Sequence, residues 1–307
     1  MKELSWNAAQ REFCIKTAPS YEWRQQMDFL RHYPPDCLYR YREGQLERAV
    51  DFGNFSWLIT VRPARQGELV VRCLNGEPTQ TERRQLAAFV SDWLDLKRDI
   101  TPFYRIAEKD PLLGASVKKY RGLRIFALPD LFEALCWSII GQQVNISFAY
   151  TLKNRFVETF GSFILWQEEK HWLFPLPALI AKLSLDDLTP LKLSRAKAGY
   201  LIGIAQAITQ GELNKEALLH EADTSAMAKR LMQFKGVGQW TADYVLMKAL
   251  LQPDAFPVGD AGVQNAVKTI LGRSEKPSEK ELREWALSWQ GWEAYATLYL
   301  WRTLFAE

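Results

Sequence analysis

The sequence predicts an α+β fold, in which a small N-terminal antiparallel-sheet α/β domain is followed by an all-helical body. In roughly the first hundred residues, apolar and polar side chains alternate along short segments bounded by turn residues, which is typical of β-strands. From about Pro111 onward, apolar side chains recur at helical spacing, with glycines or capping residues at the segment ends. We therefore expect the α/β domain at residues 1–105 and the helical region at residues 106–307.

The N-terminal domain is expected to contain four strands and one helix. The segment NFSWLITVRP places Phe55, Trp57 and Ile59 on one face, which is the period-two pattern of a half-buried strand. The segment ERRQLAAFVSDWLDL instead gathers its apolar residues on one helical face. The expected elements are a strand pair at 37–52 that turns near Gly44, strands at 54–63 and 68–74, and a helix at 82–96.

The second region is expected to form a succession of helices. Asp223 is a predicted N-cap, Ser278 and Glu281 stand in capping-box positions, and Gly161 and Gly211 follow helices as C-terminal glycines. The helical segments are 129–143, 147–161, 194–211, 223–234, 239–251, 278–289 and 292–305, and a further one follows Asp260.

The composition is that of an ordinary globular protein, with 48% hydrophobic and 24% charged residues among 307. The net charge of +3 excludes a strongly basic coat for nucleic acid, although a local basic face remains possible. Four separated cysteines and three scattered histidines show no metal-ligand spacing, so no side-chain metal site is expected. The sequence has neither a signal-peptide pattern nor a membrane-length apolar stretch, which predicts a cytoplasmic protein.

A Gly-x-Gly turn, formed by Lys235, Gly236, Val237 and Gly238, joins two helical segments. The main-chain N–H groups of the first turn of the following helix can bind an anion. No strand precedes the turn and no Lys-Ser/Thr follows it, so neither a dinucleotide fingerprint nor a P-loop is indicated. Two interpretations remain open: a helix–hairpin–helix that binds a DNA phosphate, or a turn whose glycines only permit tight packing.

Asp260 follows the loop residues Pro257, Val258 and Gly259 and precedes another helical segment. An aspartate in this position is most often a helix N-cap. The preceding helix begins at the Gly-x-Gly turn, however, so this spacing can also bring one carboxylate close to bound DNA.

These motifs, taken in order, resemble the helix–hairpin–helix base-excision DNA glycosylases. The stretch LMQFKGVGQWTADYV…FPVGDAGV resembles their hairpin, loop and aspartate, while GLRIFALPDLFEALCWSIIGQQVNISFA and WEAYATLYLWR are similar to helices of the 3-methyladenine-DNA glycosylase II branch. The resemblance covers roughly residues 110–305. It implies an N-terminal sheet like that of the TATA-binding protein and a monomer that binds double-stranded DNA containing alkylated bases.

The resemblance assigns catalysis to Asp260, whose carboxylate would stabilise the positive charge that develops on the sugar and would orient or deprotonate the attacking water. Asp243 is the competing carboxylate, but its counterpart in the family is structural. Relatives that also cut the strand carry a lysine where this chain has Trp240, which implies a monofunctional hydrolase that leaves an abasic site.

The resemblance also suggests how the damaged base is held. Trp240, Tyr244 and Trp301 would surround the flipped base, and their rings would attract cationic purines such as 3-methyladenine or 7-methylguanine; alternatively, they are core residues. The loop containing Gln142 and Gln143 would contact DNA, with Gln143 as the wedge that fills the gap in the base stack. The alternative is that this loop only caps the helix beginning near Asn145.

Other expectations concern cofactors and the class of protein. No cysteine follows Cys136, so an iron–sulfur cluster is excluded and no cofactor is required, although the family hairpin can bind sodium or potassium through main-chain carbonyls. An 8-oxoguanine-type glycosylase and a non-catalytic helix–hairpin–helix DNA-binding protein remain as alternatives. The basic run Lys118, Lys119, Arg121 and Arg124 is more typical of a solvated face than of a phosphate contact.

Overall fold

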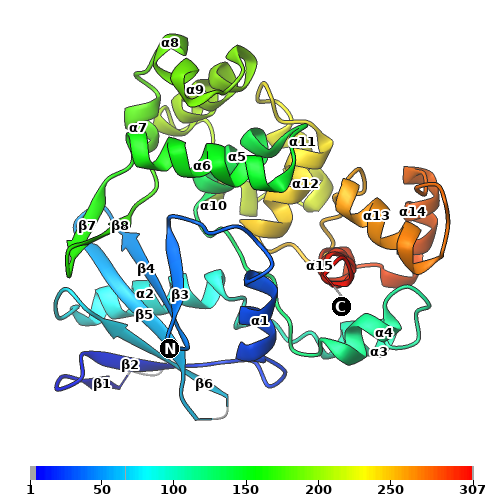
Figure 1. Cartoon of the computed structure of the whole chain (residues 1–307), viewed down its shortest axis with the longest axis horizontal. Helices are drawn as coiled ribbons and strands as arrows, with labels where there is room; N and C mark the ends of the chain where they lie inside the picture. The colour runs from blue at the N-terminus through cyan, green and yellow to red at the C-terminus, as the bar shows by residue number, and fades with distance from the viewer. Residues whose placement is uncertain (1–4, 66, 306–307) are drawn as a thin grey trace. The chain divides into compact units, whose positions relative to one another are not determined.

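The computed structural model describes residues 5–65 and 67–305 (Figure 1). Its internal contacts define two compact units, each assembled from segments that are distant in sequence. The domain boundary expected between residues 105 and 106 stays a prediction, since it divides the chain by element type rather than by contacts. The first unit combines the chain up to Pro19 with Tyr33–Lys97 and Ile140–Glu212, and the second combines Ser20–His32, Arg98–Ile139 and the chain from Leu213 onward.

The first unit contains a six-stranded sheet in which every neighbouring pair is antiparallel. The expected fold class is thereby confirmed, and so are both expected hairpins. Glu43 and Gly44 join β3 to β4 with positive φ values of 50° and 80°, which is the geometry of a tight hairpin turn. The strand order is β1-β2-β6-β5-β4-β3, with β1 Trp6–Asn7, β2 Glu12–Lys16, β3 Tyr39–Arg42, β4 Gln45–Asp51, β5 Ser56–Pro63 and β6 Glu68–Cys73.

Strand β5 differs from the expected half-buried strand, because both of its faces are buried. Leu58 and Thr60 lie on the face opposite Ile59, yet all three are buried. β5 lies between β4 and β6, in the interior of the sheet. Phe55, which was expected in the strand, precedes it and is 44% exposed.

Helix α2, Gln80–Trp93, is attached to the sheet by an aromatic contact. The guanidinium of Arg48 on β4 lies 5.2 Å from the ring centre of Phe89 and 5.1 Å from that of Trp93. Thr79 and Glu82 form a reciprocal capping box at the start of the helix. The apolar face expected for residues 82–96 is thus the face that the sheet covers.

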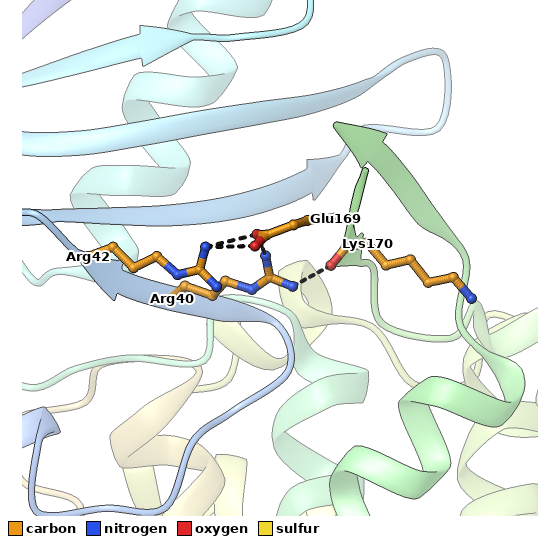
Figure 2. Close-up of polar contacts among 4 residues, drawn as sticks. All are labelled: Arg40, Arg42, Glu169 and Lys170. Atoms are coloured by element: carbon orange, nitrogen blue, oxygen red, sulfur yellow. Dashed lines mark hydrogen bonds and ion pairs between the residues drawn. The ribbon is translucent and has the colours of Figure 1, made fainter. Parts of the chain in front are cut away.

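A second, two-stranded sheet interrupts the helical region and was not expected from the sequence. Strands β7, Phe163–Trp166, and β8, Glu169–Trp172, are joined by a turn without glycine. Figure 2 shows the Glu169 carboxylate between two guanidinium groups of β3: it accepts from Arg42 at 2.9 Å with each oxygen, and also from Arg40. Hydrogen bonding by Arg42 lowers the pKa of Glu169. The small hairpin is therefore attached to the edge strand of the large sheet.

Besides α2, the first unit contains the helices α6 Ile146–Phe160, α7 Pro177–Ile180, α8 Leu185–Leu188 and α9 Arg195–Thr209, with a 3₁₀ turn at Thr189–Leu191. On α6, Lys153 donates to Asp36 at 2.7 Å, and their side chains are only 2% and 4% exposed. The neighbouring Asn154 accepts from the Cys37 amide and donates to the Pro35 carbonyl. α6 thus fixes the segment that leads into β3.

The two glycines expected at helix C-termini adopt different backbone conformations. Gly211, after α9, has φ +79°, in the left-handed region that favours glycine. Gly161 ends α6 as expected, but its backbone is extended. A Cβ atom at Gly161 would lie 2.4 Å from the carbonyl oxygen of Leu173. Glycine is therefore required at this position by close backbone approach.

The second unit is helical, and no described helix is long and apolar enough to cross a membrane. The expected N-caps are confirmed at Asp223 and Ser278. Glu281, which stands in the other capping-box position, forms an ion pair with Arg273. The helices are α1 Trp23–Leu30, α3 Thr101–Ala107, α4 Gly114–Lys119, α10 Lys215–Leu219, α11 Thr224–Leu231, α12 Gln239–Lys248, α13 Ala261–Ile270, α14 Glu279–Ala286 and α15 Glu293–Thr303, and α5 Leu131–Gly141 runs from this unit into the first.

Candidate active site

Helices α11 and α12 and the Gly-x-Gly turn between them form a helix–hairpin–helix (Figure 1). Gly236 has φ +90°, which only glycine adopts readily, and Val237 is buried beneath the turn. Gly238 is the N-cap of α12 and has an extended backbone. No atom of the described residues comes within 4 Å of a Cβ built at Gly238. Internal packing therefore does not require this second glycine, which favours close approach of a ligand over the tight-packing interpretation.

The start of α12 provides main-chain donors. Its Gly238 cap contributes no side-chain hydrogen bond to the first-turn amides, and Lys235 is exposed beside it. Amides at a helix start, with the positive end of the helix dipole behind them, bind anions. The chemistry of this turn suits a phosphate group.

Asp260 is the N-cap of α13, as its sequence position suggested, but it also makes two further hydrogen bonds. Its Oδ1 accepts from the Val263 amide at 3.0 Å and from the Trp301 indole N–H at 2.8 Å. Its Oδ2 accepts from the Trp240 indole N–H at 3.0 Å. The carboxylate thus joins the first turns of α12 and α13 to α15.

The three aromatic residues expected around the base are assembled beside this carboxylate. The ring centres of Trp240 and Tyr244 lie 5.4 Å apart, and those of Tyr244 and Trp301 lie 6.3 Å apart. All three side chains are partly exposed, so they are not simply core residues. We call Asp260, Trp240, Tyr244 and Trp301 the Asp260 cluster.

Trp137, on α5, is a further member of this neighbourhood that the sequence did not single out. Its indole N–H donates to the Tyr244 hydroxyl at 2.7 Å. Only 9% of Trp137 is exposed. A tryptophan in an apolar helix is ordinarily a core residue, and only the three-dimensional structure shows that its one polar atom orients Tyr244.

Asp243 is not a member of the Asp260 cluster, and its side chain is buried. It is 7% exposed and accepts from the Gln239 side chain at 2.9 Å. Burial raises the pKa of Asp243 from its usual 3.8 to about 6. Its counterpart in the family was expected to be structural, and the buried position agrees with that role.

The Asp243→Asn variant is expected to be more stable than the wild type at neutral pH. A carboxyl group whose pKa is higher in the folded state binds more protons when folded, so stability falls as pH rises between the two values, here 3.8 and about 6. Above that window the charged carboxylate costs at most about 3 kcal/mol, which asparagine removes. Urea unfolding at pH 4 to 8 measures the effect, with the exposed-cap variant Asp223→Asn as control. A variant that is less stable at pH 8 would contradict it.

The loop expected to contact DNA lies in the first unit, between α5 and α6. Gln143 is exposed and has a left-handed φ of 55°. Lys197 on α9 donates to the carbonyls of Ile140 at 2.8 Å and Gln142 at 2.6 Å, and these two hydrogen bonds attach the loop to α9. Asn145 caps α6 by accepting from the Phe148 amide. The cap at Asn145 is therefore present, while the DNA contact of Gln142 and Gln143 and the wedge role of Gln143 stay predictions.

The basic run Lys118, Lys119, Arg121 and Arg124 does not form one surface. Arg124 is fully buried, and its guanidinium donates to the Arg98 carbonyl and to the Ser20 hydroxyl. Arg121 pairs with Glu108 and lies 4.2 Å from the ring centre of Tyr104. A solvated face is therefore the wrong interpretation for Arg124, whose role is structural.

Comparison with known families agrees with this architecture. A family description given as HhH-GPD superfamily base excision DNA repair protein matches residues 136–291, and the N-terminal domain of 8-oxoguanine DNA glycosylase matches residues 41–135. The matched family and the fold together identify a DNA glycosylase. The chain belongs to the HhH-GPD superfamily of base excision DNA repair proteins.

Individual relatives are similar over nearly the whole chain. The DNA-3-methyladenine glycosylase of Bacillus subtilis is 36% identical over 98% of this chain and 100% of its own length. DNA-3-methyladenine glycosylase 2 of Escherichia coli is 25% identical, over 95% of this chain and 97% of its own. The 3-methyladenine DNA glycosylase structure from Archaeoglobus fulgidus superimposes with a TM-score of 0.80 at 25% identity, covering 94% of this chain and 97% of that one. The predicted resemblance to this branch is confirmed.

Proposed function

We propose that this protein binds duplex DNA, flips an alkylated purine such as 3-methyladenine or 7-methylguanine out of the helix, and hydrolyses its N-glycosidic bond. The observation that carries the proposal is the Asp260 carboxylate, held by two indole N–H groups among three partly exposed aromatic rings, next to the helix–hairpin–helix. The names of the relatives support the choice of substrate class.

The hydrogen bonds of Asp260 suit a carboxylate that acts on a sugar. Indole N–H groups are neutral and only donate hydrogen bonds. Trp240 and Trp301 therefore fix the orientation of the carboxylate without neutralising its negative charge. Oδ1 accepts two hydrogen bonds, whereas Oδ2 accepts one from the described residues and keeps a lone pair for a water molecule. The carboxylate can therefore stabilise developing positive charge and orient the nucleophile.

The proposed reaction is a hydrolysis at the sugar carbon C1′. The bond from C1′ to the base nitrogen breaks, and its electron pair leaves with the base, which neutralises a cationic alkylated purine. The oxygen of the water that Asp260 orients then bonds to C1′, and its proton passes to the carboxylate or to solvent. Because such a base is already a good leaving group, the rings of Trp240, Tyr244 and Trp301 need only attract and hold it.

The position of Trp240 supports a monofunctional enzyme. An indole cannot form the Schiff base through which a lysine cuts the strand, and here the indole N–H is directed at Asp260. We therefore propose that the product is an intact strand with an abasic site.

Two assays test this function. Purified protein incubated with methylated duplex DNA is expected to release free 3-methyladenine or 7-methylguanine, detected by chromatography, and to leave alkali-labile but uncut sites. Borohydride added during the reaction is expected to trap no covalent protein–DNA adduct, with a strand-cutting glycosylase as the positive control. Absence of base release would refute the proposed substrate, whereas a trapped adduct would refute the monofunctional mechanism.

Two observations argue against the alternative functions. An 8-oxoguanine-type enzyme shares the N-terminal domain description, but Trp240 replaces the lysine such enzymes carry. A non-catalytic binder has no need for a carboxylate, and Asp260 is partly buried and hydrogen-bonded to α12 rather than exposed and remote from the hairpin.

A cytoplasmic location, a monomeric state, a monovalent cation at the hairpin carbonyls and the absence of an iron–sulfur cluster stay predictions.

A further inference from the structure

We propose that Gly262 is a positioning residue of the Asp260 cluster. Because glycine has no side chain, the Trp301 indole can come close enough to donate a hydrogen bond to the Asp260 carboxylate. This inference rests on the proposed function for its effect on catalysis, but its structural part can be tested without DNA. Gly262 is the second residue of α13, directly after the exposed Ala261.

The close approach at Gly262 involves both ends of one hydrogen bond. A Cβ built on Gly262 would lie 2.8 Å from Oδ1 of Asp260 and 3.0 Å from both Cδ1 and Nε1 of Trp301. Those same atoms, Oδ1 and Nε1, are joined at 2.8 Å. A methyl group cannot be added beside this hydrogen bond unless the indole, the carboxylate or the first turn of α13 moves.

Backbone geometry gives no other reason for this glycine. Gly262 is not among the residues with positive φ, so the left-handed region is not required. Within a helix, alanine is the more favourable residue. Helix preference alone therefore argues for alanine here, and the contact with Trp301 and Asp260 is what argues for glycine.

Displacement of Trp301 would reach the rest of the cluster. The Trp301 ring faces Tyr244, which in turn lies beside Trp240, and Trp240 holds the other carboxylate oxygen. Gly262 consequently sets where the carboxylate stands relative to the rings that would receive the base. A residue with any side chain would enlarge or tilt that arrangement and change which bases are released.

The test compares Gly262→Ala with Gly203→Ala. Gly203 is an exposed glycine within α9, and a Cβ there meets no atom of the described residues within 4 Å, so alanine fits without strain. In single-turnover assays with methylated duplex, Gly262→Ala is expected to release base on the order of 100-fold more slowly, as for other misplacements of about 1 Å. Its affinity for unmodified duplex should stay within about twofold, and Gly203→Ala should match the wild type. Equal release rates for Gly262→Ala and wild type would overturn the proposal.

A second readout separates this inference from the proposed function. In protein labelled with isotopes at tryptophan, the Trp301 indole N–H resonance, assigned by its loss in Trp301→Phe, is expected to shift in Gly262→Ala and to stay unchanged in Gly203→Ala. This shift is expected even if the wild type releases no methylated base, a result that would refute the substrate alone. An unshifted Trp301 resonance in a folded Gly262→Ala protein would refute the positioning role itself.

A double variant tests whether both changes act on the same hydrogen bond. Gly262→Ala and Trp301→Phe each remove the Trp301–Asp260 bond, so the loss in base-release rate for the pair is expected to be much smaller than the product of the separate losses. Losses that multiply would indicate independent effects and would contradict the proposal.

Discussion

The Asp260→Asn variant is expected to bind duplex DNA like the wild type but to release methylated base on the order of 10³-fold more slowly, the scale on which preorganised electrostatic groups act. The change removes the negative charge that would stabilise the sugar cation. It also replaces one acceptor oxygen with an amide NH₂, which would face an indole N–H of Trp240 or Trp301, donor against donor. Both effects lower the rate of the chemical step.

Single-turnover release of free base measures this effect, and binding to unmodified duplex serves as its control. The helix–hairpin–helix amides lie on the Gly238 turn and not on the α13 cap, so affinity should be kept. A variant that binds DNA but retains more than a tenth of the wild-type rate would remove Asp260 from the chemistry. Loss of both binding and unfolding cooperativity would instead indicate that the α13 cap is essential for folding.

The Lys153→Met variant is expected to lose about 3–5 kcal/mol of stability, because it leaves the buried Asp36 carboxylate without its cation. Asp36 Oδ1 would still accept from the Leu38 amide, but Oδ2 would face an apolar side chain in the interior. Urea unfolding compares this variant with Lys229→Met, an exposed lysine on α11 whose loss should change stability by less than about 0.5 kcal/mol.

The double variant Lys153→Met with Asp36→Asn makes this result specific to charge. Asparagine keeps an acceptor for the Leu38 amide and carries no charge, so most of the lost stability should return. If the double variant is as unstable as Lys153→Met alone, packing around Lys153 rather than the ion pair is the important contribution.

Much of the fold follows from local sequence patterns. The β3–β4 turn at Gly44 and the helix caps at Asp223 and Ser278 depend on residues close in sequence, and these predictions are confirmed. The β7–β8 hairpin was not predicted, because its turn has no glycine and its strands have four residues each. The attachment of that hairpin depends on Arg40 and Arg42, which lie well over a hundred residues earlier in the chain.

The candidate site was only partly predictable from sequence. Helical spacing brings Trp240 and Tyr244 to one face, and the family resemblance added Asp260 and Trp301, which the structure brings to the same place. Trp137 and Gly262 could not be found in this way. Trp137 depends on a hydrogen bond to Tyr244 and Gly262 on close approach to Trp301, and each of these partners lies on a helix distant in sequence.

The interleaving of the two units affects how the protein can be made. A nascent chain that ends near residue 105 contains Asp36 and the arginines of β3, but neither Lys153 nor Glu169, which neutralise them in the finished protein. The first unit is completed only when α9 has been synthesised, because its last segment ends at Glu212. The ribosome must therefore translate the chain through Glu212 before the first unit has all its segments, and transiently exposed strands of this kind are prone to aggregation.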